Sequence, residues 1–400
     1  MIFYRNAILI RLRMSHQSVF IVAGEASGDL HGANMARELH ALAPDIRMRG
    51  MGGVGMATAG VELVVDSSDL GVIGLVEVLA SYRKIKKVLK QLKQVLHDDP
   101  PELLILIDYQ EFNQRLAKYA KSIGIKVLFY ISPQVWAWRP KRVYKMAKIV
   151  DHMAVIFPFE VPLYEQAHVP VTFTGHPLVD EVTRDKTRDQ ALAALTQINA
   201  DITRSPTVAL MPGSRKLEIS RLLPILIDCV RELRTHKPNL QYILPLANSL
   251  QLADLKAYQT DLNAFGIHVV EHATYDAIQA SDCVIVASGT ATLEIGLLGT
   301  PMVIIHKIAP LSYAILRRLV KLKHIGLVNI VPGKEIVKEF IQHDATTHNI
   351  VGEVLHLLED QAYNSEMRTQ LAALRSLLGK QGGSRNVARL ALKMIGKITG

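Results

Sequence analysis

Two kinds of hydrophobic pattern alternate along the whole chain. Short, continuous apolar runs, typical of strands buried on both faces, occupy residues 19–23, 103–107, 127–131 and 153–157 in the first half. Between them lie stretches with apolar residues at helical spacing, such as 112–122. Because strand-like and helix-like segments alternate, the pattern predicts an α/β fold with parallel sheets.

The same alternation restarts after residue 206. The second set of apolar runs covers residues 207–211, 242–246, 268–270, 283–287 and 302–305. The segment between the two sets, 180–206, is polar and poor in strand pattern, which predicts a domain junction. A chain of 400 residues also exceeds what one hydrophobic core normally supports.

These patterns predict two Rossmann-like domains, residues 14–180 and 206–382, that face each other across a cleft. We expect the fold to begin at about Met14. Residues 383–400 follow the breaker Gly382-Gly383, and we expect them to form a helix that packs back on the N-terminal domain. Ligands of such folds bind at the carboxyl ends of the strands.

The charge of the chain indicates an acidic partner. The net charge is +9, and basic residues concentrate in segments 83–93, 139–148 and 307–323. Nucleic acid, anionic lipid headgroups and phosphorylated substrates all fit such clusters, and a solvated surface is the alternative for each. The two cysteines, Cys229 and Cys283, show no metal-ligand spacing and indicate buried thiols in a reducing compartment.

One segment combines apolar and basic residues in an order typical of membrane surfaces. No apolar run approaches the ~18 residues that span a bilayer, and residues 1–13 lack a signal-peptide cleavage site. Apolar residues 70–79 run directly into the basic stretch, which favours insertion into an anionic surface, with core packing as the alternative. The residues predicted to bind acceptor or membrane are Val72, Leu75, Val76, Leu79, Arg83, Lys84, Lys86 and Lys87.

Acidic residues follow two strands of the first half. The turn after strand 19–23 carries Glu25 and Asp29, whose carboxylates would repel a phosphate, so this turn suits sugar hydroxyls or a proton in transfer. Asp108 ends strand 103–107, where partial desolvation raises a pKa toward that of a general base. Capping of the following helix is the alternative for Asp29 and for Asp108.

Two turns of the second half suit phosphate instead. Gly213, Ser214 and Arg215 follow a strand, and Ser288, Gly289 and Thr290 repeat the strand–turn–helix geometry. Backbone N–H groups and a guanidinium at such turns can hold a diphosphate, and Glu294 one turn later can take a ribose diol. Together they favour a nucleoside diphosphate, while well-capped helices are the alternative.

The remaining motifs narrow the chemistry mainly by what is missing. The sequence has no D-x-D, H-E-x-x-H, P-loop lysine or G-x-S-x-G motif, which disfavours metal-dependent sugar transfer and serine-triad hydrolysis. Trp136 and Trp138 beside Arg139 suit a sugar or an interface, with packing as the alternative. His176 could contact a phosphate, although a structural loop histidine is the preferred interpretation.

Taken as a set, these motifs resemble the lipid-A-disaccharide synthases, bacterial glycosyltransferases of lipopolysaccharide assembly. The resemblance covers almost the whole chain from about Met14. The segments that carry it are AGEASGD at 23–29, GLVEVL at 74–79, SPQVWAWR at 132–139, FPFE at 157–160, GHP at 175–177, LMPGSR at 210–215, ASGTATLE at 287–294 and residues 329–335.

The resemblance implies a GT-B fold and transfer without metal or cofactor, with UDP held by the C-terminal domain. It implies that 2,3-diacylglucosamine passes from UDP to the 6-hydroxyl of 2,3-diacylglucosamine 1-phosphate with inversion. It also implies Asp108 as the favoured base and importance for Glu25, Arg215, Glu294 and Asn329, and we add Asn329 to the residues predicted to bind UDP. It implies as well that the protein attaches peripherally to the cytoplasmic face of the inner membrane and forms a homodimer. We expect no nucleic acid among its partners.

Some alternatives stay open at this point. Both Asp108 and Glu25 are candidates for the base, and residues 109–111 lack the proline that the family usually has after the aspartate. A UDP-N-acetylglucosamine epimerase or a soluble glycosyltransferase would share the fold. A non-catalytic binder of nucleotide or acidic lipid is the alternative from another class.

Overall fold

The computed structural model of the chain describes residues 17–67, 78–138, 140–310, 313–314, 317 and 322–397. The chain divides into two compact units. Unit 1 consists of Met1–Pro177 and Gly379–Gly400, and unit 2 is Leu178–Leu378. Val72, Leu75 and Val76 of the predicted membrane segment lie outside the described residues.

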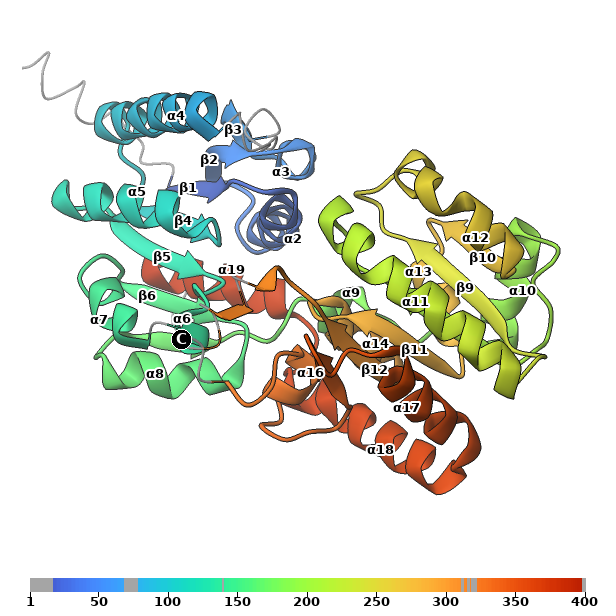
Figure 1. The fold of residues 1–400 in the computed structure, drawn as a ribbon. Coiled ribbons are helices and arrows are strands. Elements are labelled where there is room, and N and C mark those ends of the chain that lie inside the picture. Colours follow the sequence, from blue (N-terminus) through green and yellow to red (C-terminus); the bar gives the residue numbers. More distant parts are fainter. Residues whose placement is uncertain are drawn as a thin grey trace, which may run out of the picture. The chain divides into compact units, whose positions relative to one another are not determined.

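Unit 1 is built on a parallel sheet (Figure 1). In the described part of the chain the sheet has seven strands in the order β3-β2-β1-β4-β5-β6-β7. The strands are β1 (Ser18–Ala23), β2 (Arg47–Gly52), β3 (Glu62–Asp66), β4 (Leu103–Ile107), β5 (Lys126–Tyr130), β6 (His152–Val155) and β7 (Val171–Phe173). Because β1 and β4 are neighbours that run in one direction, the turns that follow them meet at one edge of the sheet.

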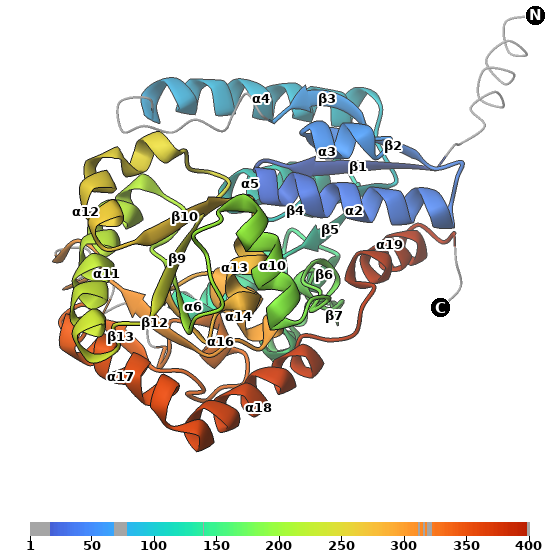
Figure 2. The same ribbon diagram turned by 90° about the vertical axis from the view of Figure 1, so that its right-hand side faces the viewer.

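Helices cover both faces of this sheet because its central strands are apolar on both. Phe20, Val22, Leu104 and Leu106 pack in one core with α4 (Val78–Asp98) and α5 (Gln110–Ser122). The alternate side chains, such as Ile107, face α2 (Ala26–Leu42), where a Cβ at Gly32 would lie 3.2 Å from Ile107 Cδ1. The C-terminal helix α19 (Gly383–Met394) packs against α2, far from it in sequence (Figure 2).

Short helices complete unit 1, one between β2 and β3 and the others between the later strands. They are α3 (Val54–Thr58), α6 (Val135–Trp138), α7 (Val143–Met146) and α8 (Val161–Gln166), with 3-10 turns at Pro140–Arg142 and Pro158–Glu160.

Asp29 caps a helix, but not the one in which it lies. Its carboxylate accepts hydrogen bonds from the backbone N–H groups of Gly53 at 2.6 Å, Gly55 at 2.9 Å and Met56 at 3.0 Å. These groups open α3, whereas the N-cap residue of α2 is Glu25, with no side-chain cap. The prediction that Asp29 caps its own helix is therefore wrong, because the carboxylate points from the first turn of α2 to α3.

This cap predicts a measurable loss of stability. Replacing the carboxylate in Asp29→Ala leaves three backbone donors without their acceptor, so the free energy of unfolding should fall by about 1–2 kcal/mol. Urea denaturation measures the change, with Asp45→Ala at an exposed position of the same unit as the control. Equal stability of the Asp29 variant and the parent chain would contradict the capping role.

Unit 2 repeats the architecture with its own parallel sheet. Its six strands in the described residues run in the order β10-β9-β8-β11-β12-β13. They are β8 (Thr207–Met211), β9 (Gln241–Leu246), β10 (Ile267–Glu271), β11 (Cys283–Ala287), β12 (Met302–His306) and β13 (Glu339–Ile341). The longer helices are α10 (Arg188–Ile198), α11 (Lys216–His236), α14 (Ala291–Leu298), α17 (Thr347–Glu359) and α18 (Gln361–Leu377). The shorter ones are α9 (Leu178–Glu181), α12 (Gln259–Ala264), α13 (Thr274–Ala280) and α16 (Leu327–Ile330), with a 3-10 helix at Leu252–Tyr258.

The segment 180–206, which the sequence suggested as a junction, is part of unit 2. It contains α10, which packs against α13 through Ala191, Leu192 and Leu195. The division between the units falls between Pro177 and Leu178.

Helix α4 separates its apolar and basic residues. Val88, Leu92 and Leu96 are buried against the sheet, whereas Arg83, Lys84, Lys86 and Lys87 are exposed. The side chain of Leu79 lies outside the described residues. Within the part of the chain that the structure describes, no helix is long and apolar enough to cross a membrane.

Candidate active site

In unit 1 the candidate base follows β4 in an unusual backbone conformation. Asp108 and Tyr109 have φ angles of +45° and +44°, which non-glycine residues rarely adopt. The ring of Tyr109 lies against Gly24, where a Cβ would come within 2.2 Å of Tyr109 Cδ1. The turns after β1 and β4 are therefore packed together, because glycine at position 24 leaves room for the ring.

A buried asparagine fixes this strained turn. The side-chain amide of Asn113 donates to the carbonyl oxygens of Ile107 at 3.1 Å and Asp108 at 2.7 Å, and its backbone N–H donates to Tyr109. Asn113 is fully buried in α5. The N-cap residue of α5 is Tyr109, without a side-chain cap, so the alternative that Asp108 caps this helix is wrong.

The surroundings of Asp108 prepare it for proton transfer. Burial and, to a smaller extent, the negative charge of Glu25 together raise the pKa of its carboxyl to about 6, against a hydrogen bond from the backbone of Tyr109 that lowers it. A carboxylate with a pKa near 6 is largely ionised at pH 7 yet more basic than an ordinary aspartate. Glu25 itself is exposed at the N-cap position of α2.

The segment after β5 that contains Trp136 is held by packing of aromatic side chains. Trp136 lies edge-on to Phe159, with ring centroids 5.2 Å apart, which supports the packing alternative for this tryptophan. The side chain of Trp138 lies outside the described residues. Burial lowers the pKa of His176 to about 3, so this histidine is neutral near pH 7 and is not a cationic phosphate ligand.

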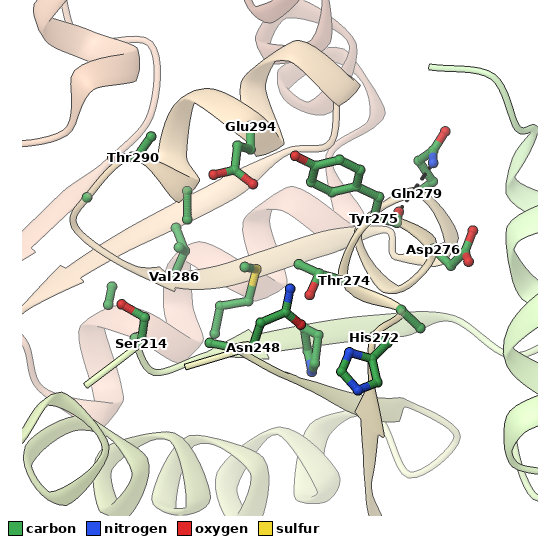
Figure 3. Close-up of a pocket in the computed structure, with 18 of the residues that line it drawn as sticks. Ser214, Asn248, His272, Thr274, Tyr275, Asp276, Gln279, Val286, Thr290 and Glu294 are labelled. Atoms are coloured by element: carbon green, nitrogen blue, oxygen red, sulfur yellow. Dashed lines mark hydrogen bonds between the residues drawn. The ribbon is translucent and has the colours of Figure 1, made fainter. Parts of the chain in front are cut away.

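In unit 2 the carboxyl ends of the strands surround a cavity of about 800 Å³ (Figure 3). Its volume is typical of sites for nucleotides and other cofactor-sized ligands. The predicted residues Gly213, Ser214, Arg215, Ser288, Gly289, Thr290 and Glu294 all line it. The structure thus brings together seven of the eight residues predicted to bind UDP.

The turn before α14 offers open hydrogen-bond donors to this cavity. In the described part of the chain, the backbone N–H groups of Gly289, Thr290 and Ala291 donate to no protein acceptor. Nothing lies within 4 Å of the place where a Cβ at Gly289 would be. Open donors at a helix N-terminus favour an anion, and the bare glycine lets it approach the backbone.

The other turn is already occupied by a carboxylate of the chain itself. Glu218 accepts from the backbone N–H groups of Ser214 at 2.8 Å and Arg215 at 3.2 Å. Its Oε1 lies 3.6 Å from Arg215 Nη1. Gly213 has a φ of +119°, and a Cβ there would come within 2.3 Å of Glu218 Oε2. The backbone donors of this turn are therefore taken by Glu218, and the side chain of Arg215, which is 82% exposed, is the group of this turn that can reach a ligand.

Glu294 points into the cavity toward the hydroxyl of Tyr275 (Figure 3). Burial raises the pKa of the Glu294 carboxyl, against a hydrogen bond from Tyr275. A partly desolvated carboxylate held by one donor keeps its other acceptor positions for a ligand diol.

Asn329 lies apart from the other residues predicted to bind UDP. It is fully buried and does not line the described cavity. Its amide donates to the carbonyl of Val337 and to Glu339 Oε1, both at 2.8 Å, while its Oδ1 accepts from Ile336 and Val337. These contacts of its polar atoms hold the segment before β13 in place, and a role of Asn329 toward UDP stays a prediction.

Several cavity residues were not predicted. Asn248, His272, Thr274 and Tyr275 follow β9 and β10, and Glu218 lies in the first turn of α11. The strand at 268–270 was recognised, so the rule that ligands bind at strand carboxyl ends could have indicated residues 272–275. Among the described residues, no group of three or more His, Cys, Asp or Glu side chains could hold a metal ion.

The two Rossmann-like sheets, with a cavity at the strand carboxyl ends of the second, define the GT-B fold. Solved structures with this fold include a UDP-GlcNAc 2-epimerase from Neisseria meningitidis bound to UDP-GlcNAc. It has a TM-score of 0.63 and 15% identity, and the match covers 94% of this chain and 100% of that one. The calicheamicin glycosyltransferase CalG4 matches with a TM-score of 0.59 and 13% identity, over 97% and 100% of the two chains.

The sequence comparison is more specific than the fold. The family model described as lipid-A-disaccharide synthetase matches residues 19–392. A lipid-A-disaccharide synthase from Geobacter metallireducens is 49% identical over 384 residues, which are 96% of this chain and 98% of that protein. The chain belongs to the lipid-A-disaccharide synthase family and is a glycosyltransferase of lipid A biosynthesis.

Proposed function

We propose that the chain joins UDP-2,3-diacylglucosamine to 2,3-diacylglucosamine 1-phosphate, with inversion at the donor C1 and without a metal ion. The observation that carries the donor half is the cavity of unit 2, where open N–H donors and Glu294 line one space. Unit 1 takes the acceptor, and the products are lipid A disaccharide 1-phosphate and UDP.

The donor half supplies charge to the leaving group. The N–H groups of Gly289, Thr290 and Ala291 and the guanidinium of Arg215 bind the diphosphate, and Glu294 accepts both ribose hydroxyls. As the bond from C1 to the diphosphate oxygen breaks, its electron pair stays on UDP. Donors already in position stabilise this growing negative charge without reorganisation.

The acceptor half supplies the base. Asp108 removes the proton of the acceptor 6-hydroxyl while its oxygen forms the new bond to C1. Its raised pKa and its fixation by Asn113 favour it over the exposed Glu25. Glu25 then acts on the acceptor side, where its charge raises the pKa of Asp108.

The direct test of this function follows UDP release by the purified chain. UDP-diacylglucosamine is supplied with the acylated 1-phosphate acceptor, without it, and with unacylated glucosamine 1-phosphate. We expect UDP release only with the acylated acceptor and one disaccharide per UDP. UDP release that does not depend on the acceptor would contradict the proposal.

We further propose peripheral attachment to the cytoplasmic face of the inner membrane through α4. Its exposed basic side chains lie opposite the buried face that packs on the sheet, and a basic surface of this kind attracts anionic headgroups. The homodimer that the resemblance implies also stays a proposal.

Charge reversal on α4 tests this attachment. The triple variant Lys84→Glu, Lys86→Glu and Lys87→Glu should bind vesicles of phosphatidylglycerol and phosphatidylcholine at least about tenfold more weakly at low salt, because each lysine contributes about 1 kcal/mol. The control carries the same charge change at scattered exposed lysines, Lys118, Lys256 and Lys380. Equal binding by the two triple variants in a vesicle sedimentation assay would contradict the role of α4.

A further inference from the structure

Unit 2 contains a second, smaller cavity with an unusual concentration of positive charge. It measures about 70 Å³, and its cationic lining residues are Arg184, Lys186, Arg188 and Arg368. Among the described residues no Asp or Glu lines it. We propose that this cavity is a binding site for a phosphate group that keeps one proton, next to the nucleotide cavity, with which it shares the lining residues Lys186 and Gln279.

The carboxylates nearby neutralise only part of this charge. Arg188 pairs with Asp282 at 3.0 Å, and Lys186 pairs with Asp276 at 2.6 Å. Asp185 also acts on Lys186. Four cations therefore face at most three acids. Burial lowers the pKa of the half-buried Arg368, and the positive charges of Arg184 and Arg188 lower it as well, whereas Asp282 raises it.

Hydrogen bonding shows which cations still have donors to give. Arg368 is committed, because its Nη1 donates to the carbonyl of Gly299 at 3.0 Å at the C-terminal end of α14. Arg184 lies over Gly299, where a Cβ would come within 3.2 Å of its Nη1, but in the described part of the chain it makes no hydrogen bond or ion pair. Its guanidinium is exposed and open to a ligand.

Two buried polar atoms of lining residues lack partners, and they differ in kind. Arg188 Nε is a donor without an acceptor, although Nη2 of the same guanidinium is bonded to Ser205 and Asp282. Gln279 Oε1 is an acceptor without a donor, and its orientation is fixed because Nε2 donates to the Tyr275 carbonyl. Figure 3 shows Gln279 at the margin of the larger cavity, beyond Tyr275 as seen from Ser214.

A protonated phosphate satisfies both atoms at once. Its oxygens accept from Arg188 and Arg184, and its remaining O–H donates to Gln279 Oε1. Sulfate is fully deprotonated near pH 7, so it would leave the glutamine oxygen without a donor. The site is therefore expected to prefer phosphate over sulfate.

Calorimetry of the full chain with inorganic phosphate, at constant ionic strength and with saturating UDP, tests this site. Bound UDP keeps phosphate out of the larger cavity. If some phosphate still binds there, the comparison of variants isolates the contribution of the smaller cavity. We expect one phosphate per chain, bound at least about fivefold more tightly than sulfate. Arg184→Gln should weaken phosphate about tenfold, and Arg184→Glu should abolish its binding.

The matched control is Arg204→Gln, since Arg204 is 76% exposed in the same unit but lines neither cavity. It should bind phosphate within twofold of the parent chain. Glucosamine 1-phosphate in place of phosphate then distinguishes a phosphate monoester from the free ion as the ligand. No phosphate binding by the parent chain, or equal binding by the parent and Arg184→Glu, would overturn the proposal.

Discussion

Asp108→Asn should lower turnover about 10²-fold or more while the affinity for UDP stays within twofold of the parent chain. The amide keeps the size of the side chain, but it cannot accept the proton of the acceptor hydroxyl. UDP affinity is unaffected because the nucleotide cavity is lined by residues of unit 2 alone. Steady-state kinetics and calorimetry with UDP measure the two quantities, with Asp45→Asn at an exposed site of unit 1 as the control. Full activity of Asp108→Asn would show that another group is the base.

The pH profile separates Asp108 from Glu25. With a pKa of about 6, Asp108 is ionised above pH 6 and protonated below it, so kcat/KM should fall tenfold per pH unit on the acid side of about pH 6. Glu25→Gln removes a negative charge that raises this pKa, so the acid limb should move to lower pH with activity retained near neutral pH. Loss of activity at every pH in Glu25→Gln, with Asp108→Asn still active, would assign the base to Glu25.

Glu294→Ala should produce the opposite pattern to Asp108→Asn. Two hydrogen bonds from the ribose hydroxyls to a carboxylate contribute about 1.5–3 kcal/mol each, so UDP affinity should fall at least about 10²-fold. Tyr275→Phe removes only the hydroxyl that holds Glu294, and it should weaken UDP by a smaller factor. Calorimetry with UDP provides the measurement.

The control for this pair is Glu366→Ala, which changes an exposed glutamate of α18 that does not line the described cavity. Its UDP affinity should match that of the parent chain. Unchanged UDP affinity in Glu294→Ala would show that Glu294 does not bind the ribose.

Strands with continuous apolar runs were predictable from the sequence, and strands whose apolar run is interrupted were not. β1, β4 and β8 are buried along almost their whole length, so their residues are apolar without interruption. β2 instead contains Arg47, whose side chain reaches Asp99 at 3.2 Å, and Gly50, where a Cβ would meet the backbone of Ile21. Such a strand shows neither an apolar run nor clean alternation.

The candidate site shows the same division between local and distant signals. Asp108 and the turn at 288–290 could be predicted because each directly follows an apolar strand. The partner of Asp29 is a helix 24 to 27 residues further along the chain, and Asn329 contacts residues seven to ten positions away. Contacts of that kind depend on tertiary packing, which hydrophobic periodicity does not report.

The anomeric configuration of the product shows whether one base and one leaving group carry out a single displacement at C1. The donor with an α-linked UDP is incubated with the acylated acceptor and the parent chain, and the C1–H1 coupling of the new linkage is measured by NMR. We expect a β-linked disaccharide, because attack by the 6-hydroxyl from the face opposite UDP inverts C1. An α-linked product would contradict the single displacement, since retention requires a second displacement or attack from the same face.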